Sequence, residues 1–235
     1  MANIALIIAG GVGARMGQDI PKQFIHVNNI PVIIYTLRAL QAHEDIDRIE
    51  VACIEGWAPV LLGYAQQFNI TKLVGVASGG ATRYESTRRG IEALGEVSDE
   101  DVILIHDAVR PLVTAASLSD VIRVCQENEN SISVLGCGDT MYVRSTVGYT
   151  SEVVDRDRLV RGQTPEAMSG RRMREMYAAA DVRGIHLDSI SAMQNALGWD
   201  IHFAEGAERN IKLTRTEDIE LFKALLLTEK DEWLK

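Results

Sequence analysis

Short runs of consecutive apolar residues alternate along the chain with longer stretches in which apolar residues recur every three or four positions. The short runs have the length and composition of strands buried on both faces of a sheet, and they cover residues 4–9, 48–54, 72–78, 102–107 and 131–136. The longer stretches have the period of helices, and they cover residues 31–42, 57–68, 86–97 and 117–128. Strands that alternate with helices predict an α/β fold, Rossmann-like, with a doubly wound and mostly parallel sheet.

The alternation ends at Gly138. Residues 139–158 hold two β-rich stretches around Gly148, which predict a hairpin arm that protrudes from the main sheet. The rest of the chain predicts helices and one strand, the helices at residues 169–182, 188–198 and 216–230 and the strand at residues 200–206. A chain of 235 residues, 46% of them hydrophobic, can close one core, so we expect a single domain over residues 1–235 with the arm at about 139–158.

Composition and charge limit the class of partner. A net charge of -9 argues against nucleic acid and against a membrane surface, since both attract basic proteins. Cys53, Cys125 and Cys137 lie in apolar runs without a CxxC pair, so neither a disulfide framework nor a zinc site is indicated. The N-terminus lacks the zones of a signal peptide and no apolar run reaches about 18 residues, so a cytoplasmic protein is expected.

The loop after the first strand is the first candidate for a ligand site, because open α/β sheets bind ligands beyond the carboxyl ends of their strands. It reads GGVGARMGQDIPKQF and combines four glycines with Arg15 and Lys22. The dinucleotide fingerprint is excluded because Met16 stands where its third glycine belongs, and the Walker A loop because no lysine precedes Lys22. A phosphate cradle of backbone N–H groups and two cations remains, with an ordinary tight turn and two solvated cations as the alternative.

Seven motifs follow one another in the order and spacing of the cytidylyltransferases that join CMP to a sugar-alcohol phosphate. They are LIIAGGVGARMG…PKQF, GGATRYES, HDAVRP, DT, DR, QTPE and NIKLT, between residue 3 and about residue 222. The chain therefore resembles this family, which includes ribitol-5-phosphate and 2-C-methyl-D-erythritol 4-phosphate cytidylyltransferases. The resemblance implies the fold of nucleotide-diphospho-sugar transferases, CTP as co-substrate, Mg²⁺ as cofactor, and a homodimer joined through the arm.

The resemblance also implies a role for individual residues. Charge on the α-phosphate and on the leaving pyrophosphate would be stabilised by Arg15 and Lys22. The implied CTP contacts are Ile8, Ala9, Gly10, Gly11, Gly13, Gly79, Gly80, Ala81, Thr82, Arg83, Ser86, Asp107 and Ala108. The implied contacts with the polyol phosphate are Asp107, Arg110, Thr140, Arg156 and Lys212. Arg156 and Lys212 would also position the phosphate for attack, and Asp107 would hold magnesium or a sugar hydroxyl.

The chemistry of this reaction explains a site made of cations. The attacking phosphate has a second pKa of about 6, so it is largely dianionic at neutral pH and needs no strong general base. The obstacle is repulsion between anions, and one cation at about 4 Å offsets roughly 4 kcal/mol of it at an effective dielectric near 20. Several cations with magnesium could therefore supply much of the barrier reduction.

Each local motif also has a plainer interpretation. Ser86 could do no more than cap the next helix, Asp107 could be a helix cap, and His106 is expected to pack or to bond locally. Arg156 would, without the resemblance, be a surface charge beside Arg158. These alternatives are open until the residues are placed in space.

The acceptor is the least determined part of the reaction. Leu187, Ser189 and Ile190 depart from the pattern of methylerythritol-phosphate enzymes, and QTPE replaces the commoner Gln-Thr-Pro-Gln. The RGQTP segment and Trp57 look more like the ribitol-phosphate branch. D-ribitol 5-phosphate is therefore the expected acceptor, 2-C-methyl-D-erythritol 4-phosphate is the second candidate, and a non-catalytic CTP-binding module is the alternative from another class.

Overall fold

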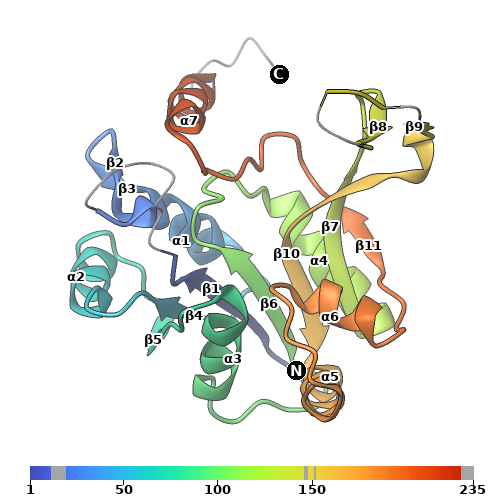
Figure 1. Cartoon of the computed structure of the whole chain (residues 1–235). Helices are drawn as coiled ribbons and strands as arrows, with labels where there is room; N and C mark the ends of the chain where they lie inside the picture. Colours follow the sequence, from blue (N-terminus) through green and yellow to red (C-terminus); the bar gives the residue numbers. More distant parts are fainter. Residues whose placement is uncertain (12–19, 146–147, 151, 229–235) are drawn as a thin grey trace.

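The structure, a computed structural model, describes residues 1–11, 20–145, 148–150 and 152–228. A seven-stranded sheet in the order β11-β7-β10-β6-β1-β4-β5 forms its centre (Figure 1). Its strands are β1 (Asn3–Ala9), β4 (Arg48–Cys53), β5 (Leu73–Ser78), β6 (Val102–Asp107), β7 (Asn130–Gly136), β10 (Val160–Ser169) and β11 (Phe203–Glu205). Every pair of neighbours is parallel except the two that involve β10, which confirms the predicted α/β fold with a mostly parallel sheet.

Helices cover both faces of this sheet, as a doubly wound fold requires. The helices are α1 (Val32–Ala42), α2 (Ala58–Gln67), α3 (Arg83–Ala93), α4 (Ala115–Asn128), α5 (Gly170–Arg183), α6 (Ile190–Ala196) and α7 (Thr216–Thr228). Apolar side chains of α1, α2 and α4 share one core with the sheet, and those of α3, α5 and α6 share a second core on the opposite face. Phe222 of α7 belongs to a third, smaller cluster with Val109 and Leu213, beside the ends of the central strands.

The sequence patterns led to two wrong expectations about strands. Residues 72–78 were expected to be buried on both faces, but β5 is the edge strand and Val74 is 59% exposed. Strand β10 was not predicted, because its Gln-Thr-Pro segment is polar and Pro165 has no N–H to donate to a ladder. The pairing of β10 with β7 shifts register between Gly162 and Glu166, on either side of that proline.

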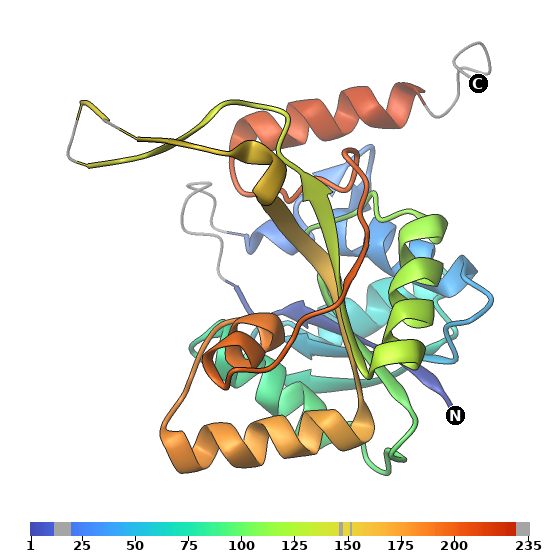
Figure 2. The same ribbon diagram turned by 90° about the vertical axis from the view of Figure 1, so that its right-hand side faces the viewer.

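The arm is a separate two-stranded sheet. Strand β8 (Met141–Val143) pairs antiparallel with β9 (Glu152–Val154), and the short 3-10 helix η3 (Arg156–Arg158) follows. Figure 2 shows this hairpin extending away from the body of the molecule. A second small hairpin joins β2 (His26–Val27) to β3 (Ile30–Pro31), next to the 3-10 helix η2 (Lys22–Phe24). Within the described residues, no helix combines the length and the apolar character needed to cross a membrane.

The strand order places a topological switch point between β1 and β6. The chain moves from β1 outward through β4 to β5, and then returns to the other side of β1 with β6. In the parallel register, Ile8 stands beside Asp107 and Ala9 beside Cys53, so the carboxyl ends of three strands meet at one edge. This edge is where open α/β sheets bind their ligands.

Candidate active site

A cavity of about 260 Å³ opens at the carboxyl ends of β1 and β6. It is lined by the end of β1, by the loops that follow β5 and β6, and by two lysines from other parts of the chain. The lining residues are Ile8, Ala9, Gly10, Gly11, Lys22, Gln23, Gly80, Ala81, Thr82, Arg83, Ser86, Asp107, Ala108, Val109 and Lys212. The structure thus brings most of the predicted site residues together, and adds Gln23 and Val109, which had not been predicted to line it.

The backbone at the end of β1 approaches α3 too closely for a side chain. A Cβ placed on Gly10 would stand 2.5 Å from Ser86 Oγ, a distance that real Cβ atoms do not reach. Gly79, which does not itself line the cavity, lies next to Gly10 on the same side. Glycine at position 10 therefore lets the β1 backbone and the start of α3 form one continuous wall.

Thr82, not Ser86, caps helix α3. The Thr82 side chain accepts a hydrogen bond from Glu85 N, and Glu85 Oε2 accepts one at 2.7 Å from the N–H of Ala81, the residue before the cap. Ser86 instead lies inside the first turn, where its Oγ accepts from Gly80 N at 3.0 Å and donates to Thr82 O at 2.9 Å. The expected cap at Ser86 is thus wrong, because the helix begins three residues earlier than its apolar pattern indicated.

Lys22 is positioned by its two neighbours in η2. Gln23 is buried and donates to Ala9 O at 2.7 Å, which fastens the short helix to the end of β1. Phe24 is buried as well and stacks on Trp57 with ring centroids 4.5 Å apart. The Lys22 ammonium then reaches into the cavity wall and donates to Leu213 O at 3.3 Å. The chain thus places a cation from residue 22 beside the segment that holds Lys212.

Three cations surround the buried carboxylate of Asp107. Its Oδ2 lies 3.0 Å from Lys212 Nζ and 3.3 Å from Arg110 Nε, and its Oδ1 lies 3.5 Å from Arg83 Nε. Burial alone would raise the pKa of Asp107, but Lys212, Arg83 and Arg110 hold that pKa well below its usual range. Asp107 is therefore ionised at neutral pH and orders three cations at the floor of the cavity.

Strand β10 supports this group from behind. Thr164 Oγ1 accepts from Asp107 N at 3.1 Å, and Gln163 Oε1 accepts from Asn210 Nδ2 at 3.2 Å, two residues before Lys212. Asn210 O in turn accepts from Arg110 Nη1 at 2.8 Å. Glu166, further along β10, pairs with Arg83 at 3.3 Å. No helix or strand pattern marks these supporting residues, and their sequence signal is their membership of the motifs QTPE and NIKLT.

His106 plays the local part expected of it. Its Nε2 lies 3.2 Å from Arg110 O, and because a carbonyl oxygen only accepts, Nε2 carries the proton. Its Nδ1 is buried and has no hydrogen-bond partner among the described residues. Burial lowers the pKa of His106 from 6.5 to about 4, against the opposing effect of Asp107. The imidazole is therefore neutral at physiological pH.

Acid should destabilise the wild-type protein more than a His106→Gln variant. Since the folded pKa is about 4 and the ordinary pKa is 6.5, the unfolded chain takes up the proton first as the pH falls. Stability from neutral His106 is fully present above pH 6.5 and declines between about pH 6.5 and 4. The difference in free energy of unfolding between wild type and variant, measured with urea, should shrink by roughly 2 kcal/mol from about pH 7 to about pH 5. A difference independent of pH would contradict the buried neutral state.

The remaining predicted residues lie elsewhere. Gly13 and Arg15 fall outside the described residues. Arg110 is not among the residues that line the cavity, but it pairs with Asp107, which does line it. Thr140 and Arg156 belong to the arm. Thr140 comes just before β8, and Arg156 begins η3 and donates to Gly138 O at 2.6 Å. Within the described part of one chain, these two arm residues are not among those that line the cavity.

The described side chains at the cavity fit a magnesium ion that is bound mainly by substrate phosphates. Among the described residues, no group of three or more His, Cys, Asp or Glu side chains is placed to hold a metal. Asp107 supplies one ionised carboxylate, and both of its oxygens already face cations. Because Mg²⁺ commonly takes one or two carboxylates together with substrate phosphates, this donor set fits an ion that arrives on a polyphosphate.

Comparison with known proteins identifies the family. The family model of 2-C-methyl-D-erythritol 4-phosphate cytidylyltransferase, IspD, matches residues 3–228. The chain is 40% identical to a ribitol-5-phosphate cytidylyltransferase of Lacticaseibacillus paracasei, over 94% of this chain and 97% of that protein. It is 31% identical to a 2-C-methyl-D-erythritol 4-phosphate cytidylyltransferase of Syntrophus aciditrophicus, over 97% of each.

A solved structure supports the same family. The crystal structure of 2-C-methyl-D-erythritol 4-phosphate cytidylyltransferase from Thermus thermophilus superposes with a TM-score of 0.77 at 27% identity, over 96% of this chain and 98% of that one. The motif resemblance and the predicted class of enzyme are thus confirmed. The chain belongs to the IspD family of cytidylyltransferases.

Proposed function

We propose that this protein transfers CMP from CTP to D-ribitol 5-phosphate, giving CDP-ribitol and pyrophosphate. The observation that supports it best is the group of cations around Asp107, at the switch point where a nucleotide is expected. The net charge of the whole chain is -9, yet among the described residues that line this cavity three are cations, Lys22, Arg83 and Lys212, and one is a carboxylate, Asp107. A cavity of that charge suits two phosphate-bearing substrates that must be brought together.

In the proposed mechanism, an oxygen of the acceptor phosphate attacks the α-phosphorus of CTP, and the bond to the β-phosphate breaks to release pyrophosphate. The N–H groups after β1 and at the start of α3 hold the nucleotide, with Gly80 to Arg83 against its base and ribose. Lys22, with Arg15, stabilises charge on the α-phosphate and on the leaving group. Lys212 holds the acceptor phosphate, which attacks as a dianion without a general base, and Arg110 supports the site through Asp107.

Magnesium enters the proposal as part of the nucleotide complex. Asp107 would supply a protein carboxylate to the ion, by exchanging part of its contact with Lys212. When bound, the ion would neutralise phosphate oxygens that otherwise repel the attacking phosphate. Lys22 and Lys212, which both line the cavity, would act on the same charges.

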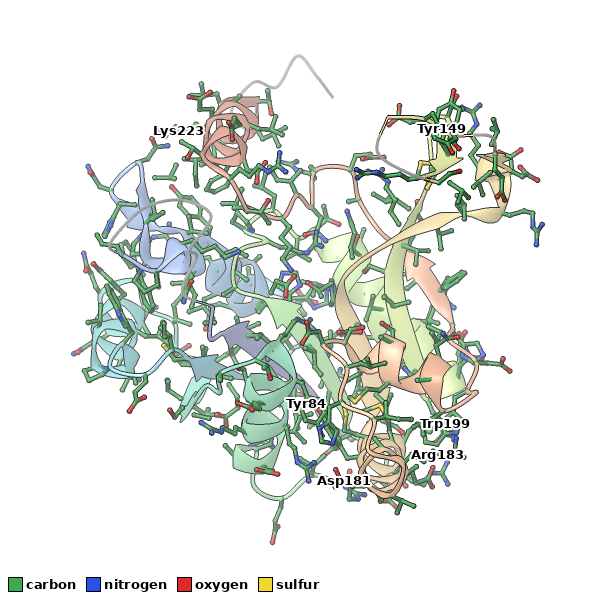
Figure 3. The ribbon with its side chains drawn as sticks, viewed as in Figure 1. Tyr84, Tyr149, Asp181, Arg183, Trp199 and Lys223 are labelled. Carbon is green, nitrogen blue, oxygen red and sulfur yellow. The ribbon has the colours of Figure 1, made fainter. Side chains whose placement is uncertain are left out.

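The arm is proposed to join two copies of the chain and to complete the acceptor pocket in trans. Tyr142, Tyr149 and Val153 are 58%, 64% and 64% exposed, and Tyr142 stands opposite Val153 across the hairpin. Figure 3 shows Tyr149 at the protruding arm. A two-stranded ribbon with apolar side chains in water is marginally stable, so an identical arm across a twofold axis is a suitable partner. Thr140 and Arg156 would then contribute to the neighbour's site.

The proposed setting is the cytoplasm, with small molecules as substrates. Cys53, Cys125 and Cys137 are free thiols, as proteins of reducing compartments commonly have. CTP and a polyol phosphate are the two partners that the cavity is proposed to take, and neither a nucleic acid nor a membrane has a part in the reaction.

Acceptor preference tests the proposal. With CTP, turnover with D-ribitol 5-phosphate should exceed turnover with 2-C-methyl-D-erythritol 4-phosphate, because the relative at 40% identity bears the name of the first enzyme and that at 31% the name of the second. Pyrophosphate release is measured with each acceptor at saturating CTP and Mg²⁺, and with ATP and GTP as controls for the base. A reversed order of kcat/KM supports the second candidate, which the name of the matching family favours. Equal rates with ATP and GTP would contradict the proposed contact of residues Gly80 to Arg83 with the cytosine base.

A further inference from the structure

Glu166 is a second buried carboxylate beside the cavity, and the mechanism above gives it no part. It lies in β10, is 1% exposed, and stands in register between Ile105 of β6 and Ile132 of β7. A charge buried between two strands is costly unless it is paired, so its partners need an explanation.

Every hydrogen-bonding direction of this carboxylate faces a donor. Oε1 accepts from both terminal nitrogens of Arg83, at 3.3 and 3.4 Å. Oε2 accepts from Ser191 N at 3.1 Å and from Ser191 Oγ at 2.9 Å. Glu166 thereby links Arg83, at the cavity wall, to the first turn of α6.

The contacts of the Arg83 side chain hold it in one position. Its Nε faces Asp107 Oδ1 at 3.5 Å, and its Nη1 also donates to the carbonyl oxygen of Asp188. It is the first residue of α3, directly after the Thr82 cap, and its side chain is 21% exposed. The guanidinium is therefore held on three sides and turns its remaining face to the cavity that it lines.

We propose that Glu166 is a positioning residue for the nucleotide, whose carboxylate fixes the Arg83 guanidinium in the cavity wall and fastens it to α6. The proposal rests on the proposed function, in which Arg83 contacts CTP. In this chain the role falls to a carboxylate, where the commoner form of the motif, Gln-Thr-Pro-Gln, has an amide of similar size. An amide at this position would turn its NH₂ group toward either Arg83 or Ser191 N, both of which only donate.

Glu166→Gln should therefore raise the KM for CTP about tenfold, the size expected when a charge-assisted contact is lost, while kcat changes less than about threefold. The KM for the polyol phosphate should not change. Direct titration of CTP, without acceptor, should show the same loss in affinity. This split between substrates is a readout that a purely structural role would not give, since general loosening of the site would affect both.

A double-mutant cycle tests whether Glu166 acts through Arg83. Arg83→Met should raise the KM for CTP on its own, and adding Glu166→Gln to it should raise the KM no further. Effects that multiply in the double variant would overturn the proposal, as would an unchanged KM in Glu166→Gln. If Glu166→Gln does not fold, Glu166→Asp keeps the charge but shortens the reach, and the same selective rise is expected; an unchanged KM there would also overturn it.

Asp181→Asn is the matched control. Asp181, labelled in Figure 3, lies on α5 and pairs with Arg88 of α3 at 2.6 Å, so the variant breaks an ion pair of the same helix outside the cavity lining. Its KM for CTP should equal that of the wild type, and a rise would mean that any disturbance of α3 gives the effect. Wild-type titration separates the two proposals. If the wild type binds no CTP the proposed function fails, whereas wild-type affinity in Glu166→Gln overturns the role of Glu166 alone.

Discussion

Lys22→Ala should lower kcat by about 10²-fold or more, while the protein stays folded. The expected size is that of one preorganised group aimed at transition-state charge, and Lys22 is placed for this by the buried Gln23 and by Phe24 on Trp57. Because the anchoring residues are untouched, the melting temperature should change little. The measurement is the initial rate of pyrophosphate release at saturating CTP and polyol phosphate.

Lys72→Ala is the control for this variant. Lys72 also donates its ammonium to a backbone carbonyl, that of His43 at 2.6 Å, but it precedes β5 and lies at the opposite end of the strands. Its kcat should be that of the wild type. If Lys22→Ala retains a kcat near the wild-type value, the cation at position 22 has no catalytic role. The proposed stabilisation of phosphate charge by Lys22 is then wrong.

The position of the candidate site could be predicted from the sequence because local patterns indicate where strands end. Residues 4–9 and 102–107 are apolar enough to be central strands, and parallel strands bring their carboxyl ends together. Gly10 and Asp107 were therefore expected near each other, and they line one cavity. The motif resemblance added Lys212, which no local pattern joins to the other residues, since it lies more than a hundred positions further along the chain.

The supporting residues could not be located in this way, because their roles depend on contacts across the sheet. Glu166 pairs with Arg83 only because β10 enters between β6 and β7, and the polar, proline-containing β10 has no strand signal. The helix start at Arg83 was missed for a related reason. Arg83, Glu85 and Ser86 make the first turn of α3 mostly polar, so the apolar pattern indicated a helix only from residue 86 onward.

Mixing two inactive variants should restore about a quarter of wild-type activity, if the proposed arm exchange is correct. Lys22→Ala removes a cation from the body, and Arg156→Ala removes one from η3, at the end of the arm. When the two proteins are unfolded together and refolded at a 1:1 ratio, half of the dimers should be heterodimers. In each of these, one site combines both lesions, whereas the other combines an intact body with an intact arm.

The exposed apolar surface of the hairpin is what makes this exchange physically reasonable. Met141, Tyr142 and Val143 are 38%, 58% and 41% exposed in a single chain, so an arm that docks on a second copy would bury surface that the isolated chain leaves in water.

The mixture is compared with each variant refolded alone and with the wild type treated in the same way, and the rate is followed against the mixing ratio. Arg161→Ala, mixed with Lys22→Ala in place of the arm variant, is the control, because Arg161 pairs on the surface with Glu208 at 2.6 Å outside the cavity lining. If each site were built from one chain, the mixture of Lys22→Ala and Arg156→Ala would stay as inactive as its components at every ratio. Thr140 and Arg156 would then have to act on their own body or not at all.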